Sequence, residues 1–231
     1  MAIFGGDPLL SLLSAEDRAA LVELGNERHY AVGQRILGQG DIDHFVGLIL
    51  RGWTVVRAEA QNGRSIIFGL CGPMDVIGEM AALDGGPRSA TVTALLDVRA
   101  RIIPAADFLS FLNNRPDARD AMARSLSARL RAADDQSRTL ATLTVLQRLA
   151  RLLLDLDADP DADLEPDPGR APAAAAPGAR LTQQEFAAAI GTTRESVAKA
   201  LADLRARGVL RSEGRRIAVL DKGALQAIAL L

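Results

Sequence analysis

Short apolar segments separated by turn residues fill much of the first half of the chain. Between about residues 30 and 104, runs rich in Val, Ile and Leu alternate with Gly, Asp and Asn, as in FVGLILRG, WTVVRAEA and RSIIFGL. Short strands at such regular spacing are typical of a compact antiparallel sandwich or barrel. Ahead of them, residues 14–24 predict a short amphipathic helix, because Ser14 is a good N-cap and acids follow in the first turn.

Beyond Pro116 the apolar spacing becomes that of helices. Apolar or small residues recur at steps of three or four residues, namely Met122, Leu126, Leu130, Ala133, Ser137 and Leu140. A stripe this narrow along a helix of about 25 residues is typical of a coiled-coil seam and predicts dimerisation through this helix. The alternative is a helix that lies on its own barrel. After a break at Thr142 and Thr144, residues 145–156 predict a second, more apolar helix.

Residues 155–179 have a composition that cannot form a core. They contain seven acids against one Arg, and five prolines between Pro160 and Pro177. We expect a flexible, solvated loop over residues 157–179, because so acidic and Pro-rich a segment has little apolar surface to bury. The same composition would also suit an interaction surface.

The C-terminal part carries the most specific pattern. The spacings Thr182-x-x-Glu185 and Thr192-x-x-Glu195 each predict a capping box that opens a helix. Gly191 lies in the tight turn between the two helices, where a left-handed residue is needed. Two helices joined by a short glycine turn are typical of a DNA-reading helix-turn-helix.

Two further features favour DNA binding over a helical hairpin used for packing or protein contact. Residues 209–220 predict two short strands around Glu213-Gly214, which would form the hairpin of a wing. Between Arg180 and Arg216 there are eight Lys or Arg and four Asp or Glu, in a chain whose net charge is −2. A local basic patch on an acidic protein is the electrostatic footprint of a nucleic-acid site.

The composition offers little material for catalysis or metal binding. Cys71 is the single cysteine, which excludes multi-cysteine zinc and iron–sulfur sites and is typical of a small buried hydrophobe. His29 and His44 have no partner at ligand spacing, so we interpret both as structural or solvated. No titratable pair is placed for acid–base or nucleophilic chemistry, and we expect no enzyme and no metal. Neither a signal-peptide pattern nor a membrane-length apolar run is present, so we expect a cytoplasmic protein.

Residues 78–90, GEMAALDGGPRSA, combine the elements of a small anion site. Glycines let backbone N–H groups approach a phosphate, Arg88 supplies two parallel donors and Ser89 adds a hydroxyl. The carboxylate of Glu79 cannot bind a phosphate, but it can accept from a sugar hydroxyl. An acid for a hydroxyl beside a base for a phosphate predicts a nucleotide site. The alternative is a surface turn whose charged side chains are solvated.

Over nearly its whole length, the sequence with these motifs resembles the Crp/Fnr family (cyclic-AMP receptor protein-like) of bacterial transcription regulators. The resemblance implies an α+β fold with an N-terminal cyclic-nucleotide-binding β-roll (jelly-roll-like) in residues 1–112. It further implies a long dimerisation helix in residues 113–142 and a C-terminal winged helix-turn-helix DNA-binding domain in residues 143–231. Family members that sense oxygen through an iron–sulfur cluster need several cysteines, so that branch is excluded.

Residues 78–90 are similar to the family's phosphate-binding cassette. The resemblance implies these nucleotide-binding residues: Gly78, Glu79, Met80, Arg88, Ser89, Ala90, Ala133 and Asp134. Glu79 would accept from the ribose 2′-hydroxyl, while Arg88 and Ser89 would donate to the cyclic phosphate. Relatives that read adenine carry Thr-Ser where this chain has Ala133 and Asp134. An aspartate can accept from guanine N1–H and N2–H or from adenine N6–H, and we expect cyclic AMP ahead of cyclic GMP as the allosteric ligand.

The resemblance also implies these DNA-binding residues: Thr182, Thr192, Thr193, Arg194, Glu195, Lys199, Arg215 and Arg216. Arg194 and Glu195 fall where relatives read base edges, since Arg favours guanine and Glu accepts from cytosine. Lys199 stands where close relatives often carry Arg, and a lysine cannot make the bidentate fork of an arginine. The implied partners are double-stranded DNA, RNA polymerase and a second copy of the chain.

The sequence as a whole predicts a homodimeric, cyclic-nucleotide-responsive, sequence-specific DNA-binding transcription regulator. Ligand binding would shift a two-state equilibrium of the long helices and so reposition the recognition helices. One alternative is a regulator of the same fold that needs no ligand, and it predicts operator binding that no nucleotide changes. Another is a nucleotide-sensing module whose helical hairpin binds protein, and it predicts ligand binding without salt-dependent DNA affinity.

Overall fold

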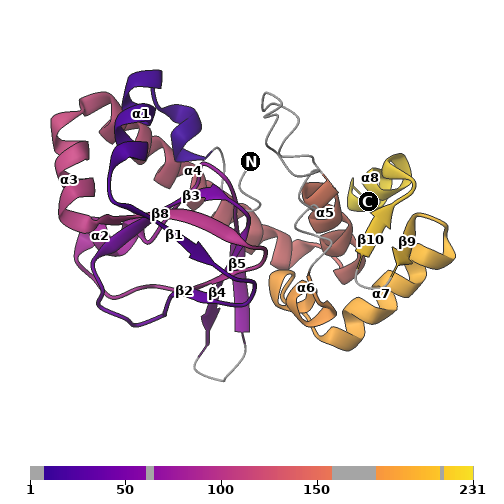
Figure 1. Ribbon diagram of the computed structural model, residues 1–231. Helices are drawn as coiled ribbons and strands as arrows, with labels where there is room; N and C mark the ends of the chain where they lie inside the picture. The colour runs from indigo at the N-terminus through magenta and orange to yellow at the C-terminus, as the bar shows by residue number, and fades with distance from the viewer. Residues whose placement is uncertain (1–7, 61–64, 158–180, 214–215, 231) are drawn as a thin grey trace, which may run out of the picture. The chain divides into compact units, whose positions relative to one another are not determined.

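The computed structural model describes residues 8–60, 65–157, 181–213 and 216–230 of the 231-residue chain. The chain folds as two compact units, Met1–Asp135 and Gln136–Leu231 (Figure 1). The acidic loop expected over residues 157–179 lies outside the described residues, except for Asp157. Among the residues described, no helix combines the length and the apolar character that a membrane span requires.

Two four-stranded sheets make up most of the first unit (Figure 1). One has the order β1-β8-β3-β6, with β1 at Asn26–Tyr30, β8 at Val98–Pro104, β3 at Phe45–Arg51 and β6 at Val76–Ile77. The other has the order β2-β7-β4-β5, with β2 at Arg35–Leu37, β7 at Thr91–Ala94, β4 at Thr54–Glu59 and β5 at Ser65–Cys71. The paired strands run antiparallel, which confirms the sandwich predicted from the spacing of the apolar runs.

The helices of the first unit precede, interrupt and follow the strands. They are the 3₁₀ turn η1 (Leu9–Leu12), α1 (Ala15–Glu23), α2 (Glu79–Asp84), α3 (Ala105–Asn114) and α4 (Pro116–Thr142). α1 begins as predicted, because the hydroxyl of Ser14 accepts from the Asp17 N–H at 3.0 Å. α2 lies between β6 and β7, which belong to different sheets, so residues 78–90 form the connection from one sheet to the other.

Apolar side chains pack on both faces of the β1-β8-β3-β6 sheet. On the inner face, Ile49 and Ala100 belong to one buried cluster with Val92 of the opposite sheet. On the outer face, Leu48 and Ile103 pack with buried residues of α1, α3 and α4. Burial of this apolar surface is the main favourable term in folding, and it gives residues 78–90 a rigid support.

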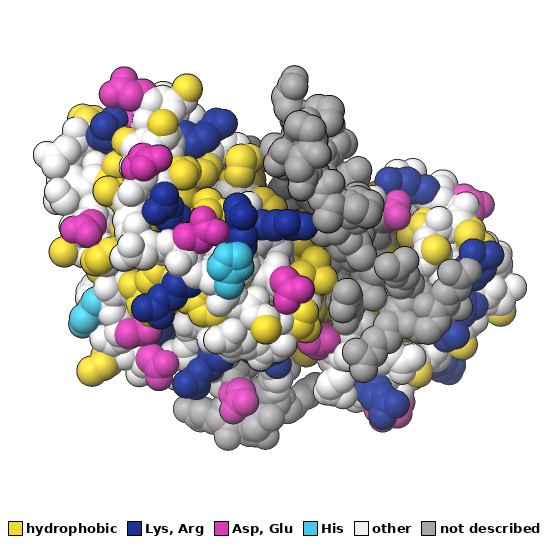
Figure 2. Space-filling model, in the orientation of Figure 1, with side chains coloured by type: hydrophobic (Ala, Val, Ile, Leu, Met, Phe, Trp, Pro, Cys, Tyr) yellow, Lys and Arg dark blue, Asp and Glu magenta, His cyan; other side chains and the backbone are white. Residues whose placement is uncertain are grey.

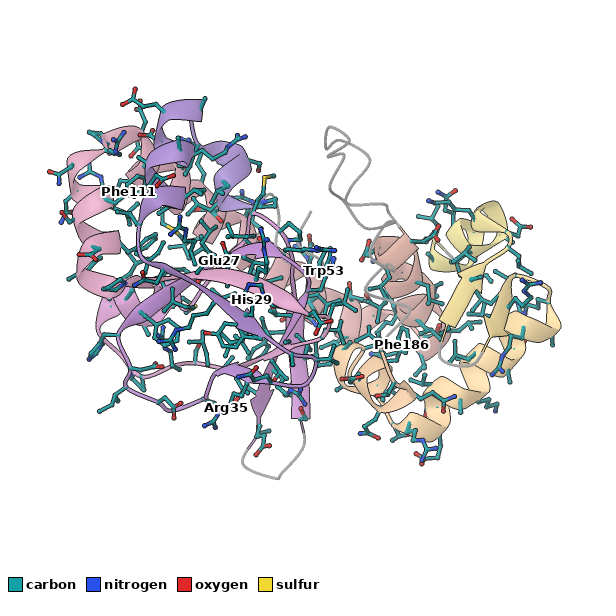
Figure 3. The ribbon with its side chains drawn as sticks, in the orientation of Figure 1. Glu27, His29, Arg35, Trp53, Phe111 and Phe186 are labelled. Carbon is teal, nitrogen blue, oxygen red and sulfur yellow. The ribbon has the colours of Figure 1, made fainter. Side chains whose placement is uncertain are left out.

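The isolated cysteine and the histidines lie where the sequence analysis puts them. Cys71 is buried in the inner cluster, as expected of a small hydrophobe. His44 is exposed, and so is His29, which lies on β1 near Glu27 (Figure 3) with 3.5 Å between its Nε2 and the Glu27 carboxylate. Both histidines are therefore solvated.

α4 begins in the first unit and ends in the second. Met122 is buried in the first unit with 3 % of its surface exposed, whereas Leu130 is 65 % exposed and Leu140 is 42 % exposed. The start of the predicted stripe therefore packs on its own barrel, as the alternative interpretation holds. Its later part leaves large apolar side chains uncovered in the single chain, which is the condition for a coiled-coil seam.

The described residues of the second unit form the end of α4, further helices and one hairpin. Its elements are α5 (Val145–Asp157), α6 (Gln183–Ala189), α7 (Arg194–Ala206), β9 (Leu210–Glu213), β10 (Arg216–Val219) and α8 (Lys222–Leu230). Leu149, Leu204 and Leu225 are fully buried where α5 packs against α7 and α8. Phe186, on α6, is 1 % exposed and completes this core (Figure 3). β9 and β10 pair antiparallel, so the predicted winged helix-turn-helix is confirmed.

Candidate nucleotide site and DNA-reading helix

The cassette, residues 78–90, folds as the short helix α2 followed by a glycine loop. Gly78 is the N-cap of α2 and has a φ of 77°, in the left-handed region. A Cβ at this position would also lie 2.5 Å from Nη1 of Arg88. Glycine is therefore favoured twice at this position, for its backbone conformation and for the close approach of Arg88.

Arg88 is buried, with 3 % of its surface exposed, and its guanidinium is held on three sides. Nε donates to Oδ1 of Asp43 at 2.7 Å, Nη1 to the Gly78 carbonyl at 2.7 Å and Nη2 to the Phe45 carbonyl at 2.5 Å. The guanidinium carbon also lies 5.0 Å from the centre of the Phe45 ring. These bonds use three of the five N–H donors of a guanidinium, and the described residues supply no acceptor for the other two.

Glu79 is held by an arginine that the sequence analysis did not single out. Arg129, on α4, donates from Nη1 to Oε1 of Glu79 at 2.7 Å and from Nη2 to the Val76 carbonyl at 3.0 Å. Glu79 is buried, with 3 % of its surface exposed, whereas the Arg129 side chain is 26 % exposed. In the sequence, Arg129 is a basic residue next to the apolar stripe of α4. Other arginines of this helix have the same kind of position, so the pattern could not single it out.

The structure brings the predicted acid and the predicted base of the cassette to one place. Arg88 bonds the carbonyl of Gly78, which directly precedes Glu79. The other predicted cassette residues differ in exposure: Met80 is 52 % exposed, Ser89 is exposed and Ala90 is buried. An exposed hydroxyl beside a buried, oriented guanidinium is a suitable arrangement for binding phosphate oxygens.

The predicted base-reading residues lie on the helix that supplies Arg129. Ala133 is one turn beyond Arg129 on α4, and Asp134 follows it; both are exposed. Residues four apart on a helix share a face. Ala133 therefore lies on the side of α4 from which Arg129 reaches the cassette.

Two more buried titratable groups, Asp75 and Cys71, lie in the segment that precedes the cassette. Burial raises the pKa of the Asp75 carboxyl to about 6, although the Gly72 N–H and the charge of Arg129 act in the opposite direction. Burial also raises the pKa of the Cys71 thiol, and a buried protonated thiol is a poor nucleophile. Within the described part of the chain, no three His, Cys, Asp or Glu side chains gather as metal ligands would.

α6 begins with the capping box that the sequence predicts. The Glu185 N–H donates to the Thr182 hydroxyl at 3.2 Å, and the Thr182 N–H donates to the Glu185 carboxylate at 2.7 Å. Each residue thus satisfies a backbone donor of the other, which fixes the start of the helix.

The second predicted capping box, at Thr192 and Glu195, is wrong by one residue. The N-cap of α7 is Thr193, whose hydroxyl accepts from the Ser196 N–H at 3.2 Å. The Thr192 N–H instead donates to the Ala187 carbonyl at 3.0 Å, so Thr192 belongs to the turn. Glu195 therefore lies in the first turn of α7, where its own backbone N–H and the Thr193 hydroxyl lower its pKa.

α7 buries one face and exposes the other. Its buried residues are Val197, Ala200, Leu201 and Leu204. Arg194, Glu195 and Lys199 are exposed. Lys and Arg side chains lie at several places along the lower right edge of the second unit in Figure 2. A helix with its N-terminal polar side chains free is suited to reading base edges in the major groove.

The remaining predicted DNA-binding residues are only partly described. Thr182 and Thr193 are exposed, and Thr192 is half-buried. Arg215 lies outside the described residues, and Arg216 is described only by its backbone, at the start of β10. All three threonines lie at or next to a helix N-terminus, where backbone N–H groups favour phosphate.

Two family models match the chain, one in each unit. Residues 27–115 match the model of the cyclic nucleotide-binding domain, and this range contains the cassette, β2 to β8 and all of β1 except Asn26. Residues 147–228 match the model of the Crp-like helix-turn-helix domain, and this range contains α6, α7 and the hairpin.

Relatives carry both parts over most of the chain. A CRP-like cAMP-activated global transcriptional regulator of Mycobacterium tuberculosis is 29% identical over 207 residues, which are 90% of this chain and 89% of the relative. The cyclic AMP receptor protein of Thermus thermophilus is 28% identical over 97% of both chains. The solved structure of a CRP/FNR-family transcriptional regulator from the same organism is 28% identical, covers 89% of this chain and 99% of its own, and has a TM-score of 0.69. With both domains matched in this order, the chain belongs to the Crp/Fnr family of transcription regulators.

Proposed function

We propose that this regulator binds a cyclic nucleotide in its β-roll and changes its affinity for DNA when it does so. The observation that carries the proposal is the arrangement of Arg88. Its guanidinium is buried and fixed by Asp43, Gly78 and Phe45, and two of its N–H donors remain for a phosphate. A cation that is already oriented loses little freedom on binding an anion.

The polar contacts divide between the phosphate and the sugar. Arg88 and Ser89 donate to the oxygens of the cyclic phosphate. Glu79 accepts from the ribose 2′-hydroxyl, and Arg129 holds this carboxylate in position through the 2.7 Å bond between them. The remaining residues shape the site without a charge: Gly78, Met80 and Ala90.

The base contacts α4, at Ala133 and Asp134, and cyclic AMP is preferred to cyclic GMP. The Asp134 carboxylate accepts from the exocyclic amino group of the purine. The names of the mycobacterial and Thermus relatives, which refer to cyclic AMP, support this order. The test of the order is the relative affinity for the two nucleotides.

The regulator acts by binding, as a homodimer, and not by catalysis. The exposed Leu130 and Leu140 of α4 support a seam between two copies. The dimer places one α7 in the major groove of each half-site of an operator, with RNA polymerase as the further partner and the cytoplasm as its location. As an allosteric device, it requires that the ligand bind the DNA-competent state more tightly.

Two measurements on the purified chain test this function. Calorimetric titration with cyclic AMP and then cyclic GMP measures ligand binding, and we expect the stronger binding for cyclic AMP. Fluorescence anisotropy with an operator duplex and a scrambled duplex, with and without nucleotide, measures its effect on DNA. If neither nucleotide changed the affinity for the operator, the chain would be a ligand-independent regulator. Nucleotide binding without salt-dependent DNA affinity would identify a protein-interaction module.

A further inference from the structure

Asp75 is a buried carboxylate for which the proposed nucleotide site has no use. It is 1 % exposed and lies between β5 and β6, directly before the strand that leads into the cassette. Its Oδ2 accepts from the Gly72 N–H at 2.8 Å, whereas its Oδ1 is buried without a hydrogen-bond partner among the described residues. An ionised carboxylate is poorly stabilised in such surroundings, because a buried charge needs partners for all of its lone pairs.

The chain connects Asp75 closely to the nucleotide site. The carbonyl of the next residue, Val76, accepts from Nη2 of Arg129 at 3.0 Å. The other terminal nitrogen of Arg129 holds Glu79. One guanidinium thus serves two buried carboxylates, one of which accepts its hydrogen bond while the other interacts with its charge at longer range.

The site carries an excess of acid before any ligand binds. Arg88 is paired with Asp43, and Arg129 is paired with Glu79. An ionised Asp75 therefore leaves one negative charge without a countercharge among these side chains. The phosphodiester of a cyclic nucleotide adds a second negative charge. Like charges repel, and the carboxylate is the weaker acid of the two, so it is the group that takes up a proton.

We propose that nucleotide binding is coupled to the uptake of a proton, and that Asp75 is the group that receives it. This inference rests on the proposed function, because it requires a cyclic nucleotide in the β-roll. Among the described residues, three titratable or charged side chains act on Asp75 from the elements around it: Cys71 from β5, Glu79 from α2 and Arg129 from α4. Burial already brings the pKa of Asp75 to about 6 in the free protein. The negative charge of a bound phosphate would act on this pKa in the same direction.

The direction of the pH dependence follows from linkage. A ligand that raises the pKa of a group binds more tightly when that group is protonated. The affinity for cyclic AMP therefore increases as the pH falls from 8 and becomes constant once Asp75 is protonated in the free protein as well. Because each unit of pKa difference corresponds to tenfold in affinity, we expect an increase of about three- to tenfold.

Calorimetry with the full chain and cyclic AMP tests the coupling. The dissociation constant is measured from pH 5.5 to pH 8, and at pH 6.5 the titration is repeated in two buffers of different ionisation enthalpy. We expect the binding heat to differ between the buffers by the amount that proton uptake requires. In Asp75→Asn, a neutral mimic of the protonated state, we expect no uptake and the high affinity at every pH; Asp75→Ser serves if the Asn variant does not fold.

Variants of the two exposed histidines, His29 and His44, are the control, because histidine is the side-chain type that ordinarily changes its charge between pH 5 and pH 8. The double variant His29→Gln/His44→Gln should keep the pH dependence of the wild type. The proposal is overturned if the wild type takes up no proton, if the Asp75 variants keep the coupling, or if the histidine variant loses it. Failure of both cyclic AMP and cyclic GMP to bind at any pH would instead overturn the proposed function.

Discussion

Arg88 has a structural role in the protein and, in the proposed function, a second role in binding the phosphate. A substitution at Ser89 separates the two roles. Within the protein, Arg88 supplies donors to the carbonyls of Gly78 and Phe45, so its removal leaves two buried acceptors unpaired. Ser89 is exposed and lies next to it in the loop. We predict that Ser89→Ala weakens cyclic-nucleotide binding by about 1 kcal/mol, roughly fivefold, at an unchanged melting temperature. Arg88→Ala should lose binding and lower the melting temperature as well.

Calorimetry and thermal unfolding of the two variants measure these effects side by side. A Ser89→Ala variant that binds cyclic AMP with wild-type affinity would remove the hydroxyl from the phosphate site. An Arg88→Ala variant with the wild-type melting temperature would mean that the hydrogen bonds of Arg88 to the backbone contribute nothing to stability.

The sequence predicts the local part of this site but not its distant partners. Glu79, Arg88 and the glycines could be recognised because their residue types and spacing within thirteen residues already suit a nucleotide. Asp43 and Arg129 lie 45 and 50 residues away from the groups they bind, and their contacts depend on how the sheets and α4 pack. Neither residue stands in a pattern that distinguishes it from other charges of the chain.

At the level of elements, α7 begins after Thr193, which is its N-cap, and not after the neighbouring Thr192. Thr193 caps the helix through the Ser196 N–H, whereas Thr192 belongs to the turn. We predict that Thr193→Ala lowers the free energy of unfolding by about 1 kcal/mol, and that Thr192→Ala lowers it by much less. Denaturant unfolding of both variants checks this. Equal losses, or a larger loss for Thr192→Ala, would contradict the observed cap.

The error in the predicted cap has a physical cause. The spacing Thr192-x-x-Glu195 fits a capping box in sequence, but Gly191 has a φ of 63° and turns the chain before Thr192. The turn therefore uses one more residue, and the helix starts one residue later. Strands were easier to predict, because the turn residues between the apolar runs mark their ends. The apolar stripe of α4 packs on the barrel at its start and is exposed in its later part. Both parts have the same helical spacing, so the sequence pattern could not distinguish them.

A further prediction concerns the sequence-specific reading of DNA by α7. Arg194 is exposed in the first turn of the helix, where a side chain reaches base edges. Arg194→Ala should cost about 1 to 3 kcal/mol per half-site on the true operator and much less on random DNA. Arg216→Ala, in the wing, should weaken all sequences alike and reduce the salt dependence by about one unit per lost phosphate contact.

Binding of both variants to operator and scrambled duplexes over a salt series distinguishes these roles. If Arg194→Ala weakened both duplexes equally, with the salt dependence of the wing variant, then α7 would contribute charge without reading sequence. An undifferentiated basic face would then explain the data better than a recognition helix.

At the scale of the whole molecule, α4 has contacts in both units. In the first unit, Arg129 of this helix bonds Glu79 of the cassette. In the second unit, Leu140 lies against the turn of the helix-turn-helix, where a Cβ on Gly191 would be 2.7 Å from its Cδ2. In the proposed function, α4 is therefore the element through which a ligand would act on the turn, because this one helix contributes contacts to each unit. Coupling of this kind requires a difference in ligand affinity between two states of the helix.

The same helix carries the prediction on assembly. Leu130 is 65 % exposed at a position of the apolar stripe, so a charge there should leave the single chain folded and open the seam. We predict that Leu130→Asp halves the mass measured by analytical ultracentrifugation and keeps the wild-type far-UV circular dichroism. Operator affinity should fall by about 100-fold or more, because each half-site is then bound without the effective concentration that the partner provides.

Val32→Asp, at a position that is 53 % exposed and lies outside the stripe, is the matched control and should leave the mass and the operator affinity unchanged. If Leu130→Asp remained dimeric, the seam would have to lie on another surface, and the exposed part of the α4 stripe would need a different partner.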